Sequence, residues 1–282
     1  MPVAKVRGVD INYQVLGTRG PWMALSPGGR RAMENVQSLA QRMADAGYRV
    51  LIHDRRNCGL SDIVIGGEQS EYEVWADDLF ELLSQLNAMP VIVGGGSSGC
   101  RLSILFALKY PQAVRALLLW RVTGGPFAAG RLTENYYGQY IRAAQSGGMA
   151  AVCGLDHFKE RGEARPANRA KLMAMDPKVF IAAMERWREQ FAKGAELPII
   201  GASAADLNSI KVPTVIIPGN DKTHAHKSAE IAHSMIPGSE LYDLFPGDLD
   251  VDLVPMEDWA HKEGEMAAIL ADFLKRKLAM AA

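Results

Sequence analysis

Short aliphatic runs alternate with longer amphipathic stretches along most of the chain, and this alternation constrains the fold more than any other feature. Strands joined by helical crossovers lie parallel, because the helix returns the chain to the same end of the sheet. The pattern therefore predicts an α/β fold, with a mostly parallel sheet and helices on both faces. The opening VAKVRGVDINYQVLG predicts two strands that meet at Gly8-Val9. Further strands are expected at 22–26, 48–54, 91–95, 116–122, 214–220 and 240–245.

Helices are predicted between these runs, and one long segment interrupts the alternation. Amphipathic spacing predicts helices over 34–46, 71–87, 98–110, 227–235 and 264–278. The interrupting segment, residues 124–211, contains no clear strand and is rich in Ala, Met and Arg. Its helices are expected at 131–147, 168–175 and 177–193. We interpret it as a helical cap inserted into an α/β core made of residues 1–123 and 212–282.

Charge and cysteine usage disfavour several classes of partner. The 282 residues contain 31 Lys and Arg against 32 Asp and Glu. The chain therefore has no excess of basic residues that could bind nucleic-acid phosphates or anionic lipids. The uncharged stretch from Ser84 to Cys100 is broken by Pro90 and glycines, so it is not expected to span a membrane. Cys58, Cys100 and Cys153 form no paired framework, which is typical of a reducing cytoplasm. We expect a cytoplasmic protein with a small-molecule substrate, and the sequence is compatible with a homo-oligomer.

The segment Gly95-Gly96-Ser97-Ser98-Gly99 lies between a predicted strand and a predicted helix. A sharp strand-to-helix turn with this G-x-S-x-G spacing exposes the central hydroxyl at the carboxyl edge of a sheet, so Ser97 is the candidate nucleophile. Glycines on either side remove Cβ atoms that would collide there. The first amides of a helix have no intrahelical acceptor, which makes the N–H of Ser98 a candidate oxyanion donor. The alternative is a glycine-rich phosphate loop, although no Lys follows at P-loop spacing.

Several segments together resemble the α/β-hydrolase superfamily over nearly the whole chain. DRRNCGLSD at 54–62 is similar to the superfamily's D-x-R-G-x-G-x-S-D segment and departs from it at Asn57-Cys58. LSPGG at 25–29 ends an early strand where the superfamily has a His-Gly turn. The resemblance implies that the amide of Gly29 is the second oxyanion donor, although Pro27 replaces the His. The segments DRRNCG and GGMAAVC also resemble a bacterial subgroup of hydrolases, and this closer match implies no substrate.

The resemblance further implies where an acid and a base follow the serine. In the superfamily the acid comes after the strand that follows the cap, and the base is a His after the last strand. Strand 214–220 ends at Asp221, for which a helix N-cap is the alternative role. His261 lies between the last strand and the final helix, and we prefer it as the base. His224, three residues after Asp221, is the alternative base.

Other side chains are candidates for substrate binding. Arg55 and Arg121 lie at strand ends on the edge that carries Ser97, where a guanidinium can bind a carboxylate in a bidentate manner. Trp120 and the cap residues Tyr136 and Tyr140 are candidates for the wall of an apolar pocket. Ordinary ion pairs and core packing are the alternative roles. No metal or organic cofactor is implied, and the aspartates of PGDLDVD lack the rest of a calcium loop.

These features predict a serine hydrolase with a small carbonyl substrate, which is an ester, an amide or a carbon–carbon bond next to a carbonyl. In this prediction Ser97 attacks, His261 transfers the proton and Asp221 orients the base. The amides of Gly29 and Ser98 bind the oxyanion. The alternative is a ligand-binding or sensor protein on the same fold that turns over slowly or not at all. The missing His-Gly turn favours that alternative.

Overall fold

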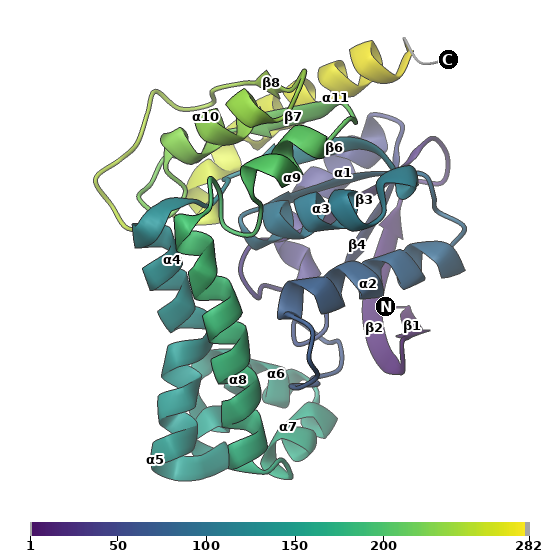
Figure 1. The fold of residues 1–282 in the computed structure, drawn as a ribbon. Coiled ribbons are helices and arrows are strands. Elements are labelled where there is room, and N and C mark those ends of the chain that lie inside the picture. Colours follow the sequence, from purple (N-terminus) through teal and green to yellow (C-terminus); the bar gives the residue numbers. More distant parts are fainter. Residues whose placement is uncertain (1, 280–282) are drawn as a thin grey trace.

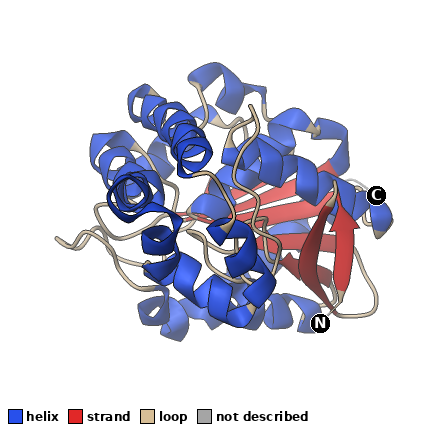
Figure 2. Cartoon of the chain, turned by 90° about the horizontal axis from the view of Figure 1, so that it is seen from below, coloured by secondary structure: helices blue, strands red, loops and turns tan. Residues whose placement is uncertain are grey.

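The computed structural model describes residues 2–279. Its strands are β1 (Val3–Val6), β2 (Val9–Leu16), β3 (Trp22–Ser26), β4 (Arg49–His53), β5 (Val91–Gly96), β6 (Val114–Trp120), β7 (Thr214–Ile217) and β8 (Glu240–Leu241). They form one eight-stranded sheet in the order β1-β2-β4-β3-β5-β6-β7-β8 (Figures 1 and 2). β2 pairs antiparallel with β1 and with β4, whereas every other neighbouring pair is parallel. The predicted α/β fold with a mostly parallel sheet is confirmed.

Helices cover both faces of this sheet. One face carries α1 (Gln37–Asp45) and α11 (Glu263–Ala279), and the other carries α2 (Glu71–Gln85), α3 (Ser98–Lys109) and α10 (His226–Met235). Side chains alternate between the faces of a strand, so Val91 and Val93 of β5 pack towards α2 and α3 while Ile92 packs towards α11. A strand buried on both faces needs apolar residues at consecutive positions. This requirement explains the continuous aliphatic runs of the sequence.

Residues 124–211, here called the helical insertion, lie between β6 and β7 and project away from the sheet (Figure 1). The insertion contains α4 (Gly125–Thr133), α5 (Gln139–Gly154), α6 (Asp156–Ala164), α7 (Pro166–Met173), α8 (Pro177–Ala192) and α9 (Ala204–Ser209). A π-helical segment, Glu134–Gly138, joins α4 to α5. Phe158, Phe180 and Trp187 are buried in a cluster that also contains Tyr72 and Trp75 of α2. The insertion therefore packs on the helix that covers the sheet.

The structure differs from the sequence prediction in several elements, among them α9, which was not predicted. The strand predicted over 240–245 is only two residues long, because the chain leaves the sheet edge and Phe245 packs on Trp259 at a centroid distance of 4.7 Å. α4 begins six residues before the helix predicted from 131, and Pro126 in its first turn suits a helix start. α6 forms where no helix was predicted. Within residues 2–279 no helix combines the length and the apolar character needed to cross a bilayer.

Candidate active site

Ser97 occupies the sharp turn between β5 and α3. Its backbone φ is +53°, in the left-handed region that residues other than glycine rarely adopt. The glycines on either side are required by close backbone contacts. A Cβ at Gly95 would lie 2.4 Å from the carbonyl carbon of Gly99, and one at Gly99 would lie 2.1 Å from the carbonyl oxygen of Ser26. No side-chain rotation relieves such contacts, so the local sequence holds the hydroxyl of Ser97 at the carboxyl end of the sheet.

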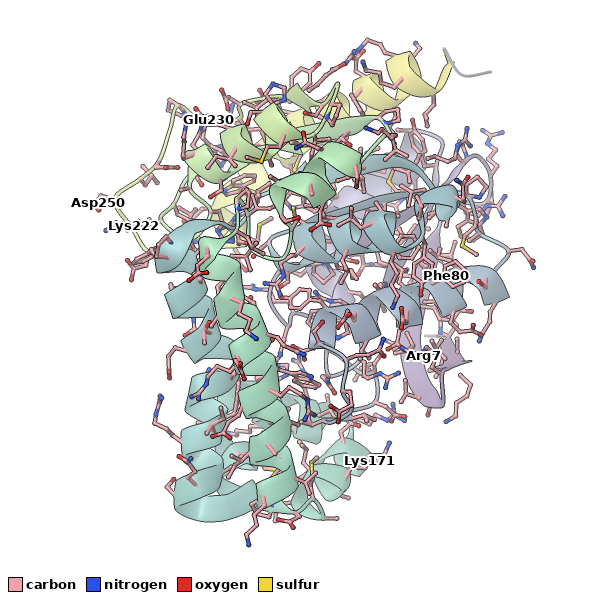
Figure 3. All side chains as sticks on the ribbon, viewed as in Figure 1. Arg7, Phe80, Lys171, Lys222, Glu230 and Asp250 are labelled. Atoms are coloured by element: carbon pink, nitrogen blue, oxygen red, sulfur yellow. The ribbon has the colours of Figure 1, made fainter. Side chains whose placement is uncertain are left out.

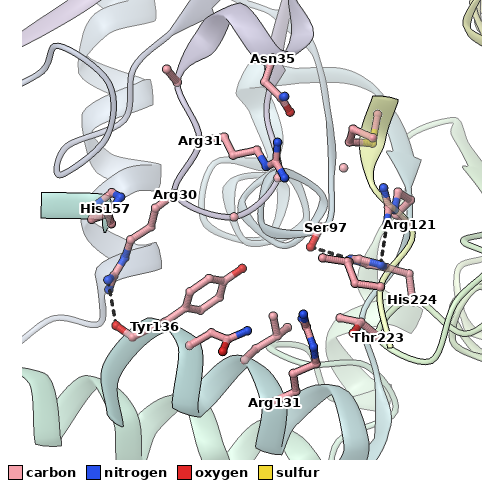
Figure 4. Close-up of a pocket in the computed structure, with 18 of the residues that line it drawn as sticks. Arg30, Arg31, Asn35, Ser97, Arg121, Arg131, Tyr136, His157, Thr223 and His224 are labelled. Carbon is pink, nitrogen blue, oxygen red and sulfur yellow. Dashed lines mark hydrogen bonds between the residues drawn. The ribbon is translucent and has the colours of Figure 1, made fainter. Parts of the chain in front are cut away.

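The imidazole of His224 lies against this hydroxyl. His224 Nε2 is 2.9 Å from Ser97 Oγ (Figure 4). His224 Nδ1 is 3.0 and 3.1 Å from the two carboxylate oxygens of Asp221. An ionised carboxylate only accepts hydrogen bonds, so Nδ1 carries the proton and donates it to Asp221. Nε2 then has the free lone pair and can accept the proton of Ser97.

A tight turn after β7 places both Asp221 and His224. The amides of Thr223 and His224 donate to Asp221 Oδ1 at 2.9 and 2.8 Å, and the amide of His224 also lies 3.1 Å from the carbonyl oxygen of Asp221. An aspartate that caps its own turn in this way reverses the chain within four residues. Gly219 makes room for the reversal, because a Cβ there would lie 2.3 Å from the Cβ of His224. Asp221 and His224 therefore come from one turn.

The carboxylate of Asp221 is fully buried and has further partners. Arg121 Nη2 donates to Asp221 Oδ2 at 2.8 Å and to the carbonyl oxygen of Val254 at 2.6 Å, while the amide of Val254 donates to Asp221 Oδ2 at 2.9 Å. Burial alone would raise the pKa of Asp221. The hydrogen bonds from His224 and Val254 and the charge of Arg121 lower this pKa below its usual range instead. Asp221 therefore stays ionised.

Burial lowers the pKa of His224, and the positive charges of Arg121 and Arg131 act in the same direction. The hydrogen bond to Asp221 opposes this shift without reversing it. The imidazole of His224 is therefore neutral at neutral pH. A neutral imidazole is the form that can accept a proton from Ser97.

The preference for His261 over His224 needs correction. His261 lies in a 3-10 segment, Met256–Lys262, where it is exposed to solvent and its ring lies 6.1 Å from that of Phe245. It does not line the pocket that contains Ser97. The loop after β8 contributes the backbone of Val254 to the site in place of an imidazole. The position of a base along the chain does not determine which histidine reaches the serine.

The acidic loop at 246–255 is bound to the turn that carries Asp221. The amide of Leu249 donates to the carbonyl oxygen of Asn220 at 2.9 Å. Lys222 Nζ pairs with Asp250 at 2.6 Å, and Figure 3 shows both side chains at the same outer edge of the molecule. Asp248 instead accepts the amide of His226 at 2.9 Å, so these carboxylates do not converge. Across residues 2–279, no group of three or more His, Cys, Asp or Glu side chains could hold a metal ion.

Both residues predicted as oxyanion donors adjoin Ser97. Ser98 is the first residue of α3, so its amide lies among those without an intrahelical acceptor, and its hydroxyl lies 2.8 Å from that of Tyr72. Gly29 lines the same pocket as Ser97 and has a φ of +51°. Its carbonyl oxygen accepts a hydrogen bond of 2.7 Å from Arg55 Nη2. That bond holds the loop after β3 beside Ser97.

Of the three residues predicted to bind substrate, Arg121 and Trp120 line the pocket and Arg55 does not. Arg55 is 1% exposed, lies 4.4 Å from the ring of Trp75 and does not line the pocket, so the prediction that it binds substrate is wrong. A strand-end position does not determine to which side a side chain turns. Arg121 lines the pocket with its guanidinium already bound to Asp221. Trp120 also lines the pocket, and a Cβ at Gly96 would lie 2.2 Å from its indole nitrogen.

The pocket between Ser97 and the helical insertion has a volume of about 610 Å³. Tyr136 and Tyr140 line it, as proposed for the cap aromatic residues. Several polar residues that no sequence motif marks also line it. They include Arg30, Arg31, Asn35, Arg131, His157 and Thr223 (Figure 4), together with Glu160 and Arg161.

The family model described as alpha/beta hydrolase fold matches residues 25–122, which include Ser97. The uncharacterized hydrolase YraK of Bacillus subtilis (strain 168) is 30% identical over 114 residues, which are 40% of this chain and 41% of that protein. The sn-1-specific diacylglycerol lipase ABHD11 of Mus musculus is 29% identical over 146 residues, 51% of this chain and 45% of that protein. The chain thus spans less than half the length of these curated relatives.

Solved structures resemble the chain over nearly its whole length. The enol-lactonase from Burkholderia xenovorans LB400 has a TM-score of 0.64 and 19% identity, with 97% of this chain and 100% of that chain covered. A thermophilic esterase from Thermogutta terrifontis has a TM-score of 0.65 and 20% identity, with 97% of this chain and 99% of that chain covered. Likeness at this level of identity concerns the fold.

Proposed function

We propose that this chain, which has the α/β-hydrolase fold, is a serine hydrolase that acts on a small carbonyl substrate. The observation that carries the proposal is the hydrogen bond of 2.9 Å between Ser97 Oγ and His224 Nε2, with Asp221 on the other imidazole nitrogen. A serine hydroxyl is protonated at neutral pH and needs such a base to become a nucleophile. Ser97 is the proposed nucleophile and His224 the proposed general base. Asp221 orients the imidazole and stabilises its charged form.

The proposed reaction passes through an acyl-enzyme. His224 Nε2 takes the proton of Ser97 Oγ while that oxygen forms a bond to the carbonyl carbon of the substrate. The amides of Gly29 and Ser98 are the proposed donors to the resulting oxyanion, and one such donor contributes about 3–4 kcal/mol to transition-state stabilisation. The imidazolium then protonates the leaving group as its bond to the carbonyl carbon breaks. Water, deprotonated by His224, attacks the acyl carbon. His224 then returns this proton to Ser97 Oγ as the bond between that oxygen and the acyl carbon breaks, and the acid is released.

The substrate class is a carboxylic ester, an amide or a carbon–carbon bond next to a carbonyl. The names of the structural neighbours, an esterase and an enol-lactonase, favour an ester or lactone among these. The pocket of about 610 Å³ has the size of a small-molecule site. We therefore use simple ethyl esters as the first substrates in the experiments below.

A fluorophosphonate probe tests the proposal, because it reacts with serines that are activated as nucleophiles. The wild-type protein should be labelled at Ser97, which mass spectrometry of the digested protein locates. Labelling should be lost in Ser97→Ala and in His224→Ala, whereas His261→Ala is the matched histidine control and should be labelled like the wild type. A folded wild-type protein that is not labelled and hydrolyses no ester would instead be a ligand-binding protein on this fold.

A further inference from the structure

The charged lining of the pocket is strongly unbalanced. Among the described residues that line it, Glu160 is the one carboxylate, and the arginines are Arg30, Arg31, Arg121, Arg131 and Arg161. Most of these guanidinium groups have a carboxylate of their own. Arg30 pairs with Glu71 at 2.9 Å, Arg121 with Asp221 at 2.8 Å and Arg161 with Glu160 at 2.8 Å. Arg31 makes a longer contact, 3.6 Å to the exposed Glu257.

Arg131 differs from the other four. It lies in the last turn of α4 and is half-buried, and its guanidinium has no hydrogen-bond or ion-pair partner within residues 2–279. Figure 4 shows its side chain rising from the helical insertion towards His224 and the Ser97 hydroxyl. Its charge is close enough to contribute to the lowered pKa of His224. A guanidinium that lines a pocket and has no partner in the protein can bind a negatively charged ligand without first breaking an ion pair.

We propose that the pocket binds a substrate that carries a carboxylate, and that Arg131 binds this carboxylate while Ser97 attacks a different carbonyl group of the same molecule. The proposal rests on the proposed function, because it names the substrate class of that site. A planar guanidinium matches a carboxylate in a bidentate manner. One unpartnered guanidinium balances one negative charge, so a carboxylate fits this site better than a phosphate dianion. Arg31, on the opposite wall, adds to the positive potential.

Two esters of equal length test this proposal. Monoethyl adipate carries a carboxylate where ethyl hexanoate carries a methyl group, and both release ethanol. We expect the wild type to prefer monoethyl adipate by about 10- to 100-fold in kcat/KM, the range for a charge-assisted hydrogen-bonded pair. In Arg131→Gln the ratio of the two kcat/KM values should fall to about one, and this ratio cancels any change in His224 that affects both esters alike. Arg131→Lys should keep part of the preference, because it keeps the charge and loses the fork geometry.

The matched control is Arg115→Gln, which removes one positive charge from an exposed position on β6 outside the pocket. It should retain the wild-type preference. If Arg131→Gln and Arg115→Gln behave alike, or if the wild type hydrolyses both esters equally well, the proposal is wrong although the protein is still a serine hydrolase.

Calorimetric binding separates this proposal from the proposed function. Dicarboxylates from succinate to adipate should bind the wild type and the Ser97→Ala variant, adipamide should not compete, and binding should weaken about 10-fold or more in Arg131→Gln. Dicarboxylate binding in a protein that no fluorophosphonate labels would support the carboxylate site and overturn the hydrolase. If none of the dicarboxylates binds, or if Arg131→Gln binds them as tightly as the wild type, the carboxylate site is overturned.

Discussion

Asp221 on the sheet side of the pocket and Arg131 on the insertion side differ in how their charged groups are bound. On the sheet side, Asp221 accepts hydrogen bonds from an imidazole, from three backbone amides and from Arg121. On the insertion side, Arg131 has no partner in the described part of the chain. Groups with all partners in place are fixed before a substrate arrives, whereas an unpartnered guanidinium is available to it. The difference suggests that the sheet edge determines the reaction and the insertion selects the substrate.

The largest effect should come from the base on the sheet side. His224→Ala is expected to lower kcat/KM for ethyl hexanoate by about 10⁴-fold or more, because Ser97 then has no group to accept its proton. His261→Ala should stay within about twofold of the wild type, because the exposed side chain lies outside the pocket. Ethanol release under identical conditions measures both. A larger loss in His261→Ala than in His224→Ala would overturn the assignment of the base.

The next effect concerns Arg121, which positions Asp221 and does not act on the substrate in our proposal. Arg121→Gln keeps a donor for the carbonyl oxygen of Val254 and removes the charge. We expect kcat/KM to fall about 10- to 100-fold, the value of one charge-assisted hydrogen bond. Because Arg121 lowers the pKa of His224, its removal should raise that pKa.

The pH dependence of kcat/KM separates this role from simple destabilisation. The base must be neutral to act, so activity is lost as pH falls through the pKa of His224. In Arg121→Gln this loss should begin at a higher pH than in the wild type. A profile that is lowered uniformly, with no displacement along the pH axis, would show that Arg121 acts only on the stability of the fold.

The parts of the site that depend on local structure could be predicted from the sequence. Ser97 could be predicted because its glycines and the flanking strand and helix are contiguous in the sequence. Asp221 could be placed because it ends a recognisable strand. The choice between His224 and His261 could not be made in this way, since it depends on a turn that Asp221 closes with its own side chain. Two features of the sequence indicate this turn, namely Gly219 and the spacing Asp221-x-x-His224.

The substrate side was less predictable for a physical reason. A strand end tells which edge of the sheet a residue reaches, yet the side chain of Arg55 turns inward to the carbonyl oxygen of Gly29. Arg131 belongs to the helical insertion, whose helices pack through contacts between segments far apart in the chain. Amphipathic spacing predicts that such helices exist and gives no information on which of their polar side chains faces a pocket.

His53, the last residue of β4, lies outside the pocket and differs from Asp221 in its hydrogen bonding. It is 1% exposed, neither ring nitrogen has a hydrogen-bond partner among residues 2–279, and burial lowers its pKa to about 3. Between the unfolded pKa near 6.5 and this value, only the unfolded chain binds the proton, so acid favours unfolding by about 1.4 kcal/mol per pH unit. His53→Leu removes this penalty.

Urea unfolding at pH 8 and pH 5 measures the effect. The free energy of unfolding of His53→Leu minus that of the wild type should be larger, in the direction of greater stability, by about 2 kcal/mol at pH 5 than at pH 8. The sign follows from the lowered pKa, because the destabilisation is absent above pH 6.5 and grows as pH falls. If the variant and the wild type differ in free energy of unfolding by the same amount at both pH values, His53 has the same pKa in the folded and the unfolded chain.

The smallest effect should come from Tyr136, on the insertion side. Its hydroxyl lies 3.3 Å from Ser98 Oγ, and it makes no hydrogen bond to Ser97 or His224. Tyr136→Phe removes one neutral hydrogen-bonding group from the pocket wall, so we expect KM to rise about 2- to 5-fold with kcat unchanged. Michaelis–Menten kinetics with monoethyl adipate and ethyl hexanoate measure both parameters. A fall in kcat of equal size for the two esters would show that the insertion takes part in the chemical step, and the division between the two sides of the pocket would then be wrong.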